Sequence, residues 1–258
     1  MTIVTDFHSH VAPSSAYEMI QAAHKKGLRV LGLSEHVFQM SEVRPLLQHL
    51  PQEGPLLTFA TYADQVQAAA HDLQFDTRLG LEVDFIPRKN EQIQSYVQAH
   101  NWDYLIGSVH EINYEIIEIH WKKSREEGEA LWLQYFELLR GAVGSGYFQV
   151  VSHPVRMRVG NPHLPPTFDV ELERLAAEAT RCNVALELNG YDMLNYPSLV
   201  RRLARACVLQ HTPVSVSSDA HYPKEVAWAH QQTEAIMREM GLSKVRTWRR
   251  CEAEEYGI

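Results

Sequence analysis

Two histidines lie one residue apart near the start of the chain, in the run TDFHSHVAPSS. His8 and His10 follow a short stretch, Thr2–Phe7, whose residues are typical of a β-strand. An H-x-H pair at a strand end directs both imidazoles to the same side. Imidazole is the commonest metal ligand in proteins, so the pair predicts one corner of a metal site. The remaining ligands must then come from elsewhere in the chain.

Short runs rich in Val, Ile and Leu alternate along the chain with longer stretches of helical periodicity. The expected strands are Thr2–Phe7, Leu28–Leu33, Arg78–Val83, Tyr104–Val109, Phe148–Ser152, Val184–Leu188, Val214–Ser217 and a short terminal one, Arg246–Arg249. The expected helices are Ser15–Lys26, Tyr62–Leu73, Asn90–His100, Glu126–Val143, Val170–Arg181, Ser198–Leu209 and Val226–Met240. A loop rich in Pro and Gly is expected between Val37 and Thr58. Seven βα repeats without a change in composition predict one α/β domain over residues 1–258, a (β/α)7 TIM-like barrel, with a doubly wound open sheet as the alternative.

The carboxyl ends of the strands in such a barrel face one common site. Each of the seven expected ends carries an ionisable or metal-binding side chain. The residues, end by end, are Asp6, His8 and His10; Ser34, Glu35 and His36; Glu82 and Asp84; Ser108, His110 and Glu111; Ser152 and His153; Glu187 and Asn189; Ser218, Asp219 and His221. Six of the 14 histidines lie at these ends, a concentration that chance placement does not explain.

Imidazoles and carboxylates without cysteine suit Zn, Mn or Fe. Six histidines and two or three carboxylates exceed what a single ion can take, so the set predicts two or three divalent transition-metal ions with a bridging carboxylate. Paired ions about 3.5–4 Å apart occur in phosphatases and nucleases, where they generate hydroxide and clamp phosphate oxygens. The strand ends therefore predict a metal cluster of the kind found in phosphatases and nucleases.

Composition narrows the possible partners. The chain of 258 residues has a net charge of −8 and no long basic run, which argues against nucleic acid as a partner. Cys182, Cys207 and Cys251 lack CxxC spacing, which argues against disulfides and against a thiolate zinc site. No apolar run reaches the roughly 18 residues of a membrane span, and no signal peptide pattern is present. We expect a cytoplasmic monomer or homodimer that acts on a small phosphorylated metabolite.

The runs DFHSH, LSEHV, GLEVDF, GSVHEI, SHP and SSDAH resemble, in order and spacing, the motifs of the PHP (polymerase and histidinol phosphatase) superfamily over nearly the whole chain. GLEVDF followed by DYLIGSVH is similar to the histidinol-phosphate phosphatase branch. The resemblance implies a distorted (β/α)7 barrel with a metal cluster at its C-terminal face. It assigns the first ion to His8, His10, Glu82 and Asp219, the second to Glu82, His110 and His153, and the third to His36 and His221.

The loop after His10 departs from this pattern. Members of the branch usually carry a further histidine a few residues after H-x-H, as a ligand of the third ion. This chain reads HVAPSSAYE at that point and has no other histidine before His24. Ser14, Ser15, a water or a group from elsewhere must replace that histidine, or the third ion is weakly bound or absent.

The resemblance implies hydrolysis of a phosphate monoester by a metal-bridging hydroxide. The first substrate to consider is L-histidinol phosphate, cleaved to L-histidinol and phosphate in histidine biosynthesis. The alternatives are a PHP-fold phosphatase acting on phosphotyrosine, a nucleotide or a sugar phosphate, and a non-catalytic metal-binding regulatory module.

Residues beyond the ligand set have expected roles as well. Asp219 and His221 are the candidate catalytic groups, although both are also expected to be ligands. An arginine fork matches two phosphate oxygens, and His120 lies in the loop after the fourth strand. The expected substrate-binding residues are Arg156, Arg158, Arg249 and His120. Asp6 is expected to orient one of the metal-binding imidazoles.

Overall fold

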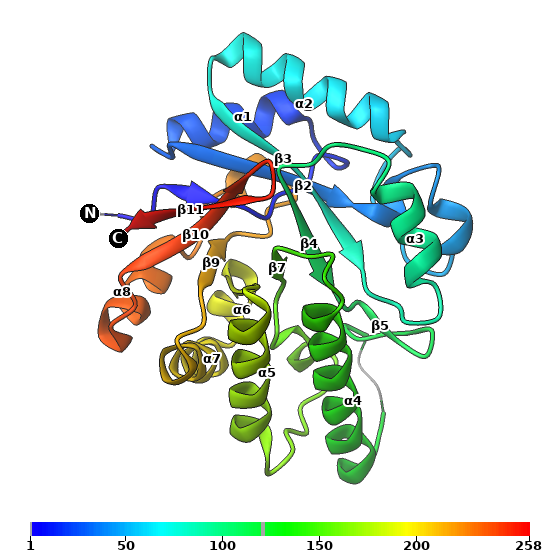
Figure 1. The fold of residues 1–258 in the computed structure, drawn as a ribbon, viewed down its shortest axis with the longest axis vertical. Coiled ribbons are helices and arrows are strands. Elements are labelled where there is room, and N and C mark those ends of the chain that lie inside the picture. Colours follow the sequence, from blue (N-terminus) through cyan, green and yellow to red (C-terminus); the bar gives the residue numbers. More distant parts are fainter. Residues whose placement is uncertain (1, 120–121) are drawn as a thin grey trace.

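Seven parallel strands form a nearly closed ring in a computed structural model that describes residues 2–119 and 122–258 (Figure 1). The strands of the ring are β1 (Thr5–Asp6), β2 (Val30–His36), β3 (Asp76–Asp84), β4 (Tyr104–Ser108), β7 (Val150–Val151), β8 (Ala185–Asn189) and β9 (Val214–Ser217). The α-helices are α1 (Ala16–Lys25), α2 (Phe59–Leu73), α3 (Asn90–Val97), α4 (Arg125–Gly144), α5 (Phe168–Cys182), α6 (Gly190–Asn195), α7 (Pro197–Gln210) and α8 (His230–Met240). Two hairpins, β5–β6 (Glu111–Ile112, Glu115–Ile116) and β10–β11 (Lys244–Arg249, Glu252–Gly257), lie outside the ring.

The strand order decides between the two expected architectures. Neighbouring strands follow the order of the chain without reversal, from β1 through β4 and β7 to β9. A bridge between Ser9 and Ala220 then joins the first strand to the last. This order confirms the barrel and excludes the doubly wound open sheet, which requires a reversal of strand order.

Two of the expected boundaries are wrong in an informative way. Strand β2 continues through His36, three residues beyond the expected end, so His36 lies on the strand itself. Helix α8 begins at His230 rather than at Val226, because Ala227 and Ala229 adopt left-handed backbone conformations, with φ of 56° and 60°.

Neither hairpin was expected as such, and of their four strands only β10 was, as the terminal strand Arg246–Arg249. Their turns place two successive residues at positive φ, Asn113–Tyr114 in one and Arg250–Cys251 in the other. Two-residue hairpin turns of this kind are usually recognised by Asn-Gly or Asp-Gly pairs, which neither turn contains.

The side-chain alternation of β3 separates two cores. Leu81 and Val83 point outward and belong to the large core beneath the helices. Gly80 points inward, where it faces the Tyr104 ring, and Glu82 follows it on the same side. The barrel interior begins with a small apolar cluster made of Phe7, Val30, Tyr104, Ile106, Val150, Ala185 and Trp248.

The β10–β11 hairpin closes the N-terminal end of the barrel. Trp248 packs against Phe7 and Tyr104 with ring centroids 6.1 Å apart in both pairs. Arg78 is buried beneath the hairpin, where its guanidinium donates to both Asp76 oxygens and to the Trp248 carbonyl.

The expectation that Arg249 binds substrate is contradicted by its position. Its Nη2 lies 2.9 Å from an oxygen of Asp76, the first residue of β3. Glu82 and Asp84 end that strand, so Arg249 lies at the end of the barrel opposite the strand ends that carry the expected ligands.

The remaining expectations concern cysteines and membranes. Cys182, Cys207 and Cys251 are all free thiols, as their spacing indicated. Over residues 2–119 and 122–258, no helix has both the length and the apolar character needed to cross a membrane.

The contact between Gly80 and Tyr104 can be tested by adding one methyl group. A Cβ at position 80 would lie 2.3 Å from Cζ of Tyr104, so Gly80→Ala should lower the free energy of unfolding by about 1–3 kcal/mol in urea titrations. The double variant Gly80→Ala/Tyr104→Leu should lose less free energy of unfolding than the two single variants lose together, because leucine leaves room for the methyl group. Strictly additive losses would contradict this packing.

Candidate metal centre

The buried Glu82 side chain presents its two oxygens to different groups of imidazoles. Oε2 lies 3.2 Å from Nε2 of His8 and 3.7 Å from Nε2 of His10. Oε1 lies 3.1 Å from Nε2 of His153 and 3.4 Å from Nε2 of His110. Two ligand atoms on one tetrahedral zinc, each at about 2.1 Å, lie about 3.4 Å apart. The spacing thus suits one ion at each oxygen of Glu82, with the carboxylate as the bridge.

Asp219 completes the group around Oε2. Its Oδ1 lies 3.2 Å from Nε2 of His10 and 3.6 Å from Nε2 of His8. The structure therefore brings together the four residues expected at the first ion, from the segment after β1, from β3 and from the loop after β9. It also brings together the three residues expected at the second ion.

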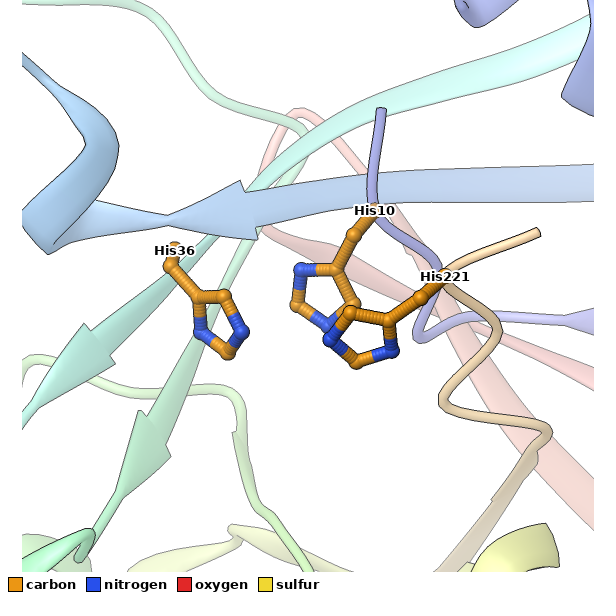
Figure 2. Close-up of side chains that lie close together, drawn as sticks. All are labelled: His10, His36 and His221. Carbon is orange, nitrogen blue, oxygen red and sulfur yellow. The ribbon is translucent and has the colours of Figure 1, made fainter. Parts of the chain in front are cut away.

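His36 and His221, the residues expected at the third ion, lie beside His10 (Figure 2). Potential ligand atoms of these three histidines all lie within 4.8 Å of one another. The His10 ring stacks on both neighbours, with centroids 4.0 Å from His36 and 4.2 Å from His221. His36 also reaches back to the bridge, since its Nδ1 lies 2.6 Å from Oε2 of Glu82.

Carboxylates behind two of the imidazoles fix their orientation. In each case Nδ1 is hydrogen-bonded to the carboxylate and Nε2 faces Glu82, an arrangement that holds the ring of a metal ligand and increases its basicity. The pairs are His8 with Glu187 at 2.8 Å and His110 with Asp84 at 2.8 Å, whereas Glu35 lies 3.5 Å from Nδ1 of His10 without a hydrogen bond.

Unpaired buried atoms test whether these residues fit a metal. His8 Nε2, Glu82 Oε2 and Glu53 Oε2 are buried and have no hydrogen-bond partner among the residues described. Leaving a polar atom in this state costs about 1–3 kcal/mol. A divalent cation satisfies such nitrogen and oxygen atoms together, so the residues present fit a metal centre.

Local electrostatics keeps the bridging group in the form that binds metal. Burial would raise the pKa of Glu82, but neighbouring imidazoles, including those of His8 and His36, hold that pKa well below its usual range. Burial lowers the pKa of His153, and the nearby Arg156 guanidinium lowers it further, which favours the neutral imidazole. An ionised carboxylate and a neutral imidazole are the ligand forms that metals require. Burial alone would lower the pKa of His8, His36, His110 and His221, but the neighbouring carboxylates raise it, so a metal ion must displace a proton from these imidazoles.

Two of the expected ligands have unusual backbone conformations. His153 and Asp219 follow β7 and β9 with φ of 32° and 60°. Such angles are uncommon for residues other than glycine and cluster at functional sites. Hydrogen bonds hold both residues, since His153 N–H donates to Glu187 and Asp219 N–H donates to the His8 carbonyl.

Arg156 lines a pocket beside the cluster, but its nitrogens are already engaged. It is buried and donates to four acceptors: Asp192 at 2.8 Å, Glu118 at 2.9 Å, Asn189 at 3.0 Å and Asp219 at 2.5 Å. This geometry favours a role in holding Asp219 over the direct phosphate contact expected from the sequence. Arg158 stacks instead over the Tyr196 ring at 5.3 Å, and His120 lies outside the described residues.

The pocket has a volume of about 120 Å³ and opens over the imidazoles of His36, His110 and His221. One part of its wall is apolar, formed by Phe38, Leu50, Pro51 and Ile116. Glu53 and Glu118 add two carboxylates. Neither was expected from the sequence, because each lies in an irregular segment away from the expected strand ends.

The expected role of Asp6 is wrong. Its oxygens accept hydrogen bonds from the backbone N–H and hydroxyl of Ser218 and from the Ala227 N–H. Asp6 therefore fixes the loop that carries Asp219, and Glu187 and Asp84 take the role of orienting imidazoles.

The sequence profile of the PHP domain matches residues 4–190, which is most of the chain. This chain belongs to the PHP domain family. A protein of Deinococcus radiodurans named "Probable histidinol-phosphatase" is 29% identical over 260 residues, which cover 93% of this PHP chain and 95% of that protein. A protein of the same name from Schizosaccharomyces pombe is 27% identical over 270 residues and covers 92% of this chain.

A solved structure supports the fold of this PHP chain. Histidinol phosphate phosphatase from Lactococcus lactis, in complex with zinc, L-histidinol and phosphate, superposes with a TM-score of 0.79. The match covers 97% of this chain and 98% of the other, at 16% identity. The likeness confirms the TIM-like barrel.

The carboxylate behind His110 provides a test of the centre. Asp84→Asn replaces a charged acceptor with a neutral one. It should lower the affinity for the second zinc ion by about 10–100-fold, as measured by competition with a chromophoric chelator. Asp72→Asn, on the exposed face of α2, is the matched control and should bind zinc like the unaltered protein. Equal zinc affinities in the two variants would contradict the orienting role of Asp84.

Proposed function

We propose that this PHP chain is a phosphate monoester hydrolase that uses two or three divalent ions, Zn, Mn or Fe, and that its substrate is L-histidinol phosphate. The observation that carries the proposal is the division of the Glu82 oxygens between two groups of imidazoles, His8, His10 and His36 at Oε2 and His110 and His153 at Oε1. The two relatives named as histidinol-phosphatases and the Lactococcus lactis complex support this choice of substrate.

The residues are assigned to the ions as their distances suggest. His8, His10, Glu82 and Asp219 would hold the first ion, and Glu82, His110 and His153 the second. Ions bound at such a site supply a nucleophile generated from water near neutral pH and positive charge that stabilises the phosphoryl oxygens.

In this proposal Asp219 contributes a negative charge as a ligand and does not serve as the general acid. Burial would raise the pKa of Asp219, but His8 and Arg156 hold it well below its usual range. The carboxylate is therefore ionised at neutral pH and cannot protonate a leaving group. His221 is anchored by Nδ1 to the Asp219 carbonyl at 3.0 Å and turns its Nε2 toward Glu53. The leaving alkoxide is a strong base, and in our proposal it takes its proton from water in the pocket.

The pocket suits the cationic leaving group of histidinol phosphate. This substrate carries an ammonium group and an imidazole next to its phosphate ester. The Glu118 carboxylate in the pocket matches the ammonium charge, and the apolar wall near Phe38 and Ile116 suits the imidazole ring. Since the net charge of the chain is −8, a small metabolite is a better substrate than a nucleic acid.

Phosphate release from a panel of monoesters tests the function. With Zn, Mn or Fe, histidinol phosphate should be cleaved faster than p-nitrophenyl phosphate, phosphotyrosine, a nucleotide and a sugar phosphate. Glu82→Gln should lower the rate by about 10³-fold, because the amide cannot bridge two ions. Glu115→Gln, at an exposed carboxylate of β6, should leave the rate unchanged.

Three results would argue against the proposal. Elemental analysis that finds no transition metal after metal-supplemented expression would exclude the centre. Unchanged turnover in Glu82→Gln would exclude the bridging role. Equal, feeble rates on every ester would favour a different substrate or a regulatory module.

A further inference from the structure

One carboxylate reaches the pair of imidazoles expected at the third ion. Oε2 of Glu53 lies 3.4 Å from Nε2 of His36 and 3.2 Å from Nε2 of His221. These separations are close to the roughly 3.4 Å between two ligand atoms of one tetrahedral zinc. Glu53 therefore lies within ligand distance of both imidazoles.

The Glu53 oxygen is also buried and accepts no hydrogen bond from the described residues, although the side chain as a whole is partly exposed. His36 is almost fully buried, and the Phe38 ring stacks on it at 4.3 Å with an interplanar angle of 18°. The imidazole is thus held in place with Nε2 facing this oxygen.

The loop between β2 and α2 is built to bring Glu53 to this position. The Glu53 N–H lies 3.3 Å from the side-chain oxygen of Gln39, which is buried. The ends of the loop are tied together, because Leu57 N–H donates to the Gln39 carbonyl and Ser41 N–H donates to the Leu57 carbonyl.

Gly54 packs this loop against the segment that follows His10. A Cβ at position 54 would lie 2.5 Å from the Ala12 carbonyl oxygen, so only glycine allows this approach. Ala12 belongs to the run HVAPSS, where the histidine that the resemblance leads one to expect is missing. The carboxylate thus comes from a loop that contacts the very segment lacking the ligand.

The serines of that run are weaker candidates. Ser15 caps α1, since its hydroxyl accepts from the Glu18 N–H and donates to the Glu18 carboxylate. A neutral hydroxyl is also a poorer ligand for zinc than a carboxylate. The Ser14 hydroxyl is also buried without a hydrogen-bond partner among the described residues, but of the two side chains only Glu53 has a described contact with His36 and His221.

We propose that Glu53 replaces the missing histidine as a protein ligand of a third divalent ion, together with His36 and His221. This inference rests on the metal centre of the proposed function. Two imidazoles and one carboxylate are a common ligand set of catalytic zinc, and they leave a further position for water or a phosphate oxygen.

Zinc stoichiometry tests this assignment without relying on activity. Metal-free full-length chain is titrated with Zn²⁺ against a chromophoric chelator, and the bound zinc is counted by elemental analysis after gel filtration. The unaltered protein and the Ser14→Ala control should bind three ions per chain. Glu53→Gln should bind two, with the first two affinities unchanged. Glu53→His should restore the third ion, because it returns an imidazole to the site.

The possible outcomes separate this inference from the proposed function. Three ions in Glu53→Gln, or two in both this variant and the unaltered protein, would overturn the inference and leave the bridged pair intact. Loss of the third ion in Ser14→Ala alone would also overturn it. An unaltered protein that binds no zinc would overturn the proposed metal centre as well. Circular dichroism and thermal unfolding verify that each variant is folded.

Discussion

The ionised Glu82 carboxylate stands inside the barrel without exposure to solvent, and the rest of the site is arranged around it. Burying such a charge costs several kcal/mol unless partners offset it. Imidazoles on both sides and the Ser108 hydroxyl, 2.6 Å from Oε1, supply those partners. Because the partners come from many strands, the carboxylate keeps its place only when the whole ring of strands is assembled.

The alternation of side chains along each strand creates this arrangement. On β4, Ile106 lies in the apolar cluster, Ser108 donates to Glu82, and His110 follows just beyond the strand end. Strand β8 repeats this order, with Ala185 in the apolar cluster and Glu187 two residues further on among the charged groups. The interior therefore changes from apolar to ionisable along the barrel axis, and the charged groups pack above the small apolar cluster.

Much of this could be predicted from the sequence, because parallel strands place their ends on one face. His8, His110 and Asp219 each follow a recognisable strand, so their meeting required only the fold. Glu53 could not be found in this way, since its position depends on the path of an irregular loop. Arg249 was misplaced because the β10–β11 turn carries no glycine or asparagine, so the direction of the terminal strand was hidden.

The ring of strands has a seam between β1 and β9, where a single bridge, Ser9 to Ala220, connects the strands. His10 lies on one side of this seam and Asp219 on the other, 209 positions apart in the chain. In the proposed centre an ion held by both is a cross-link, which closes a loop of nearly the whole polypeptide much as a disulfide would. The chemistry and this additional closure of the barrel would then depend on the same ions, beside the backbone hydrogen bonds that join His10 to Ala220 and Asp219 to His8.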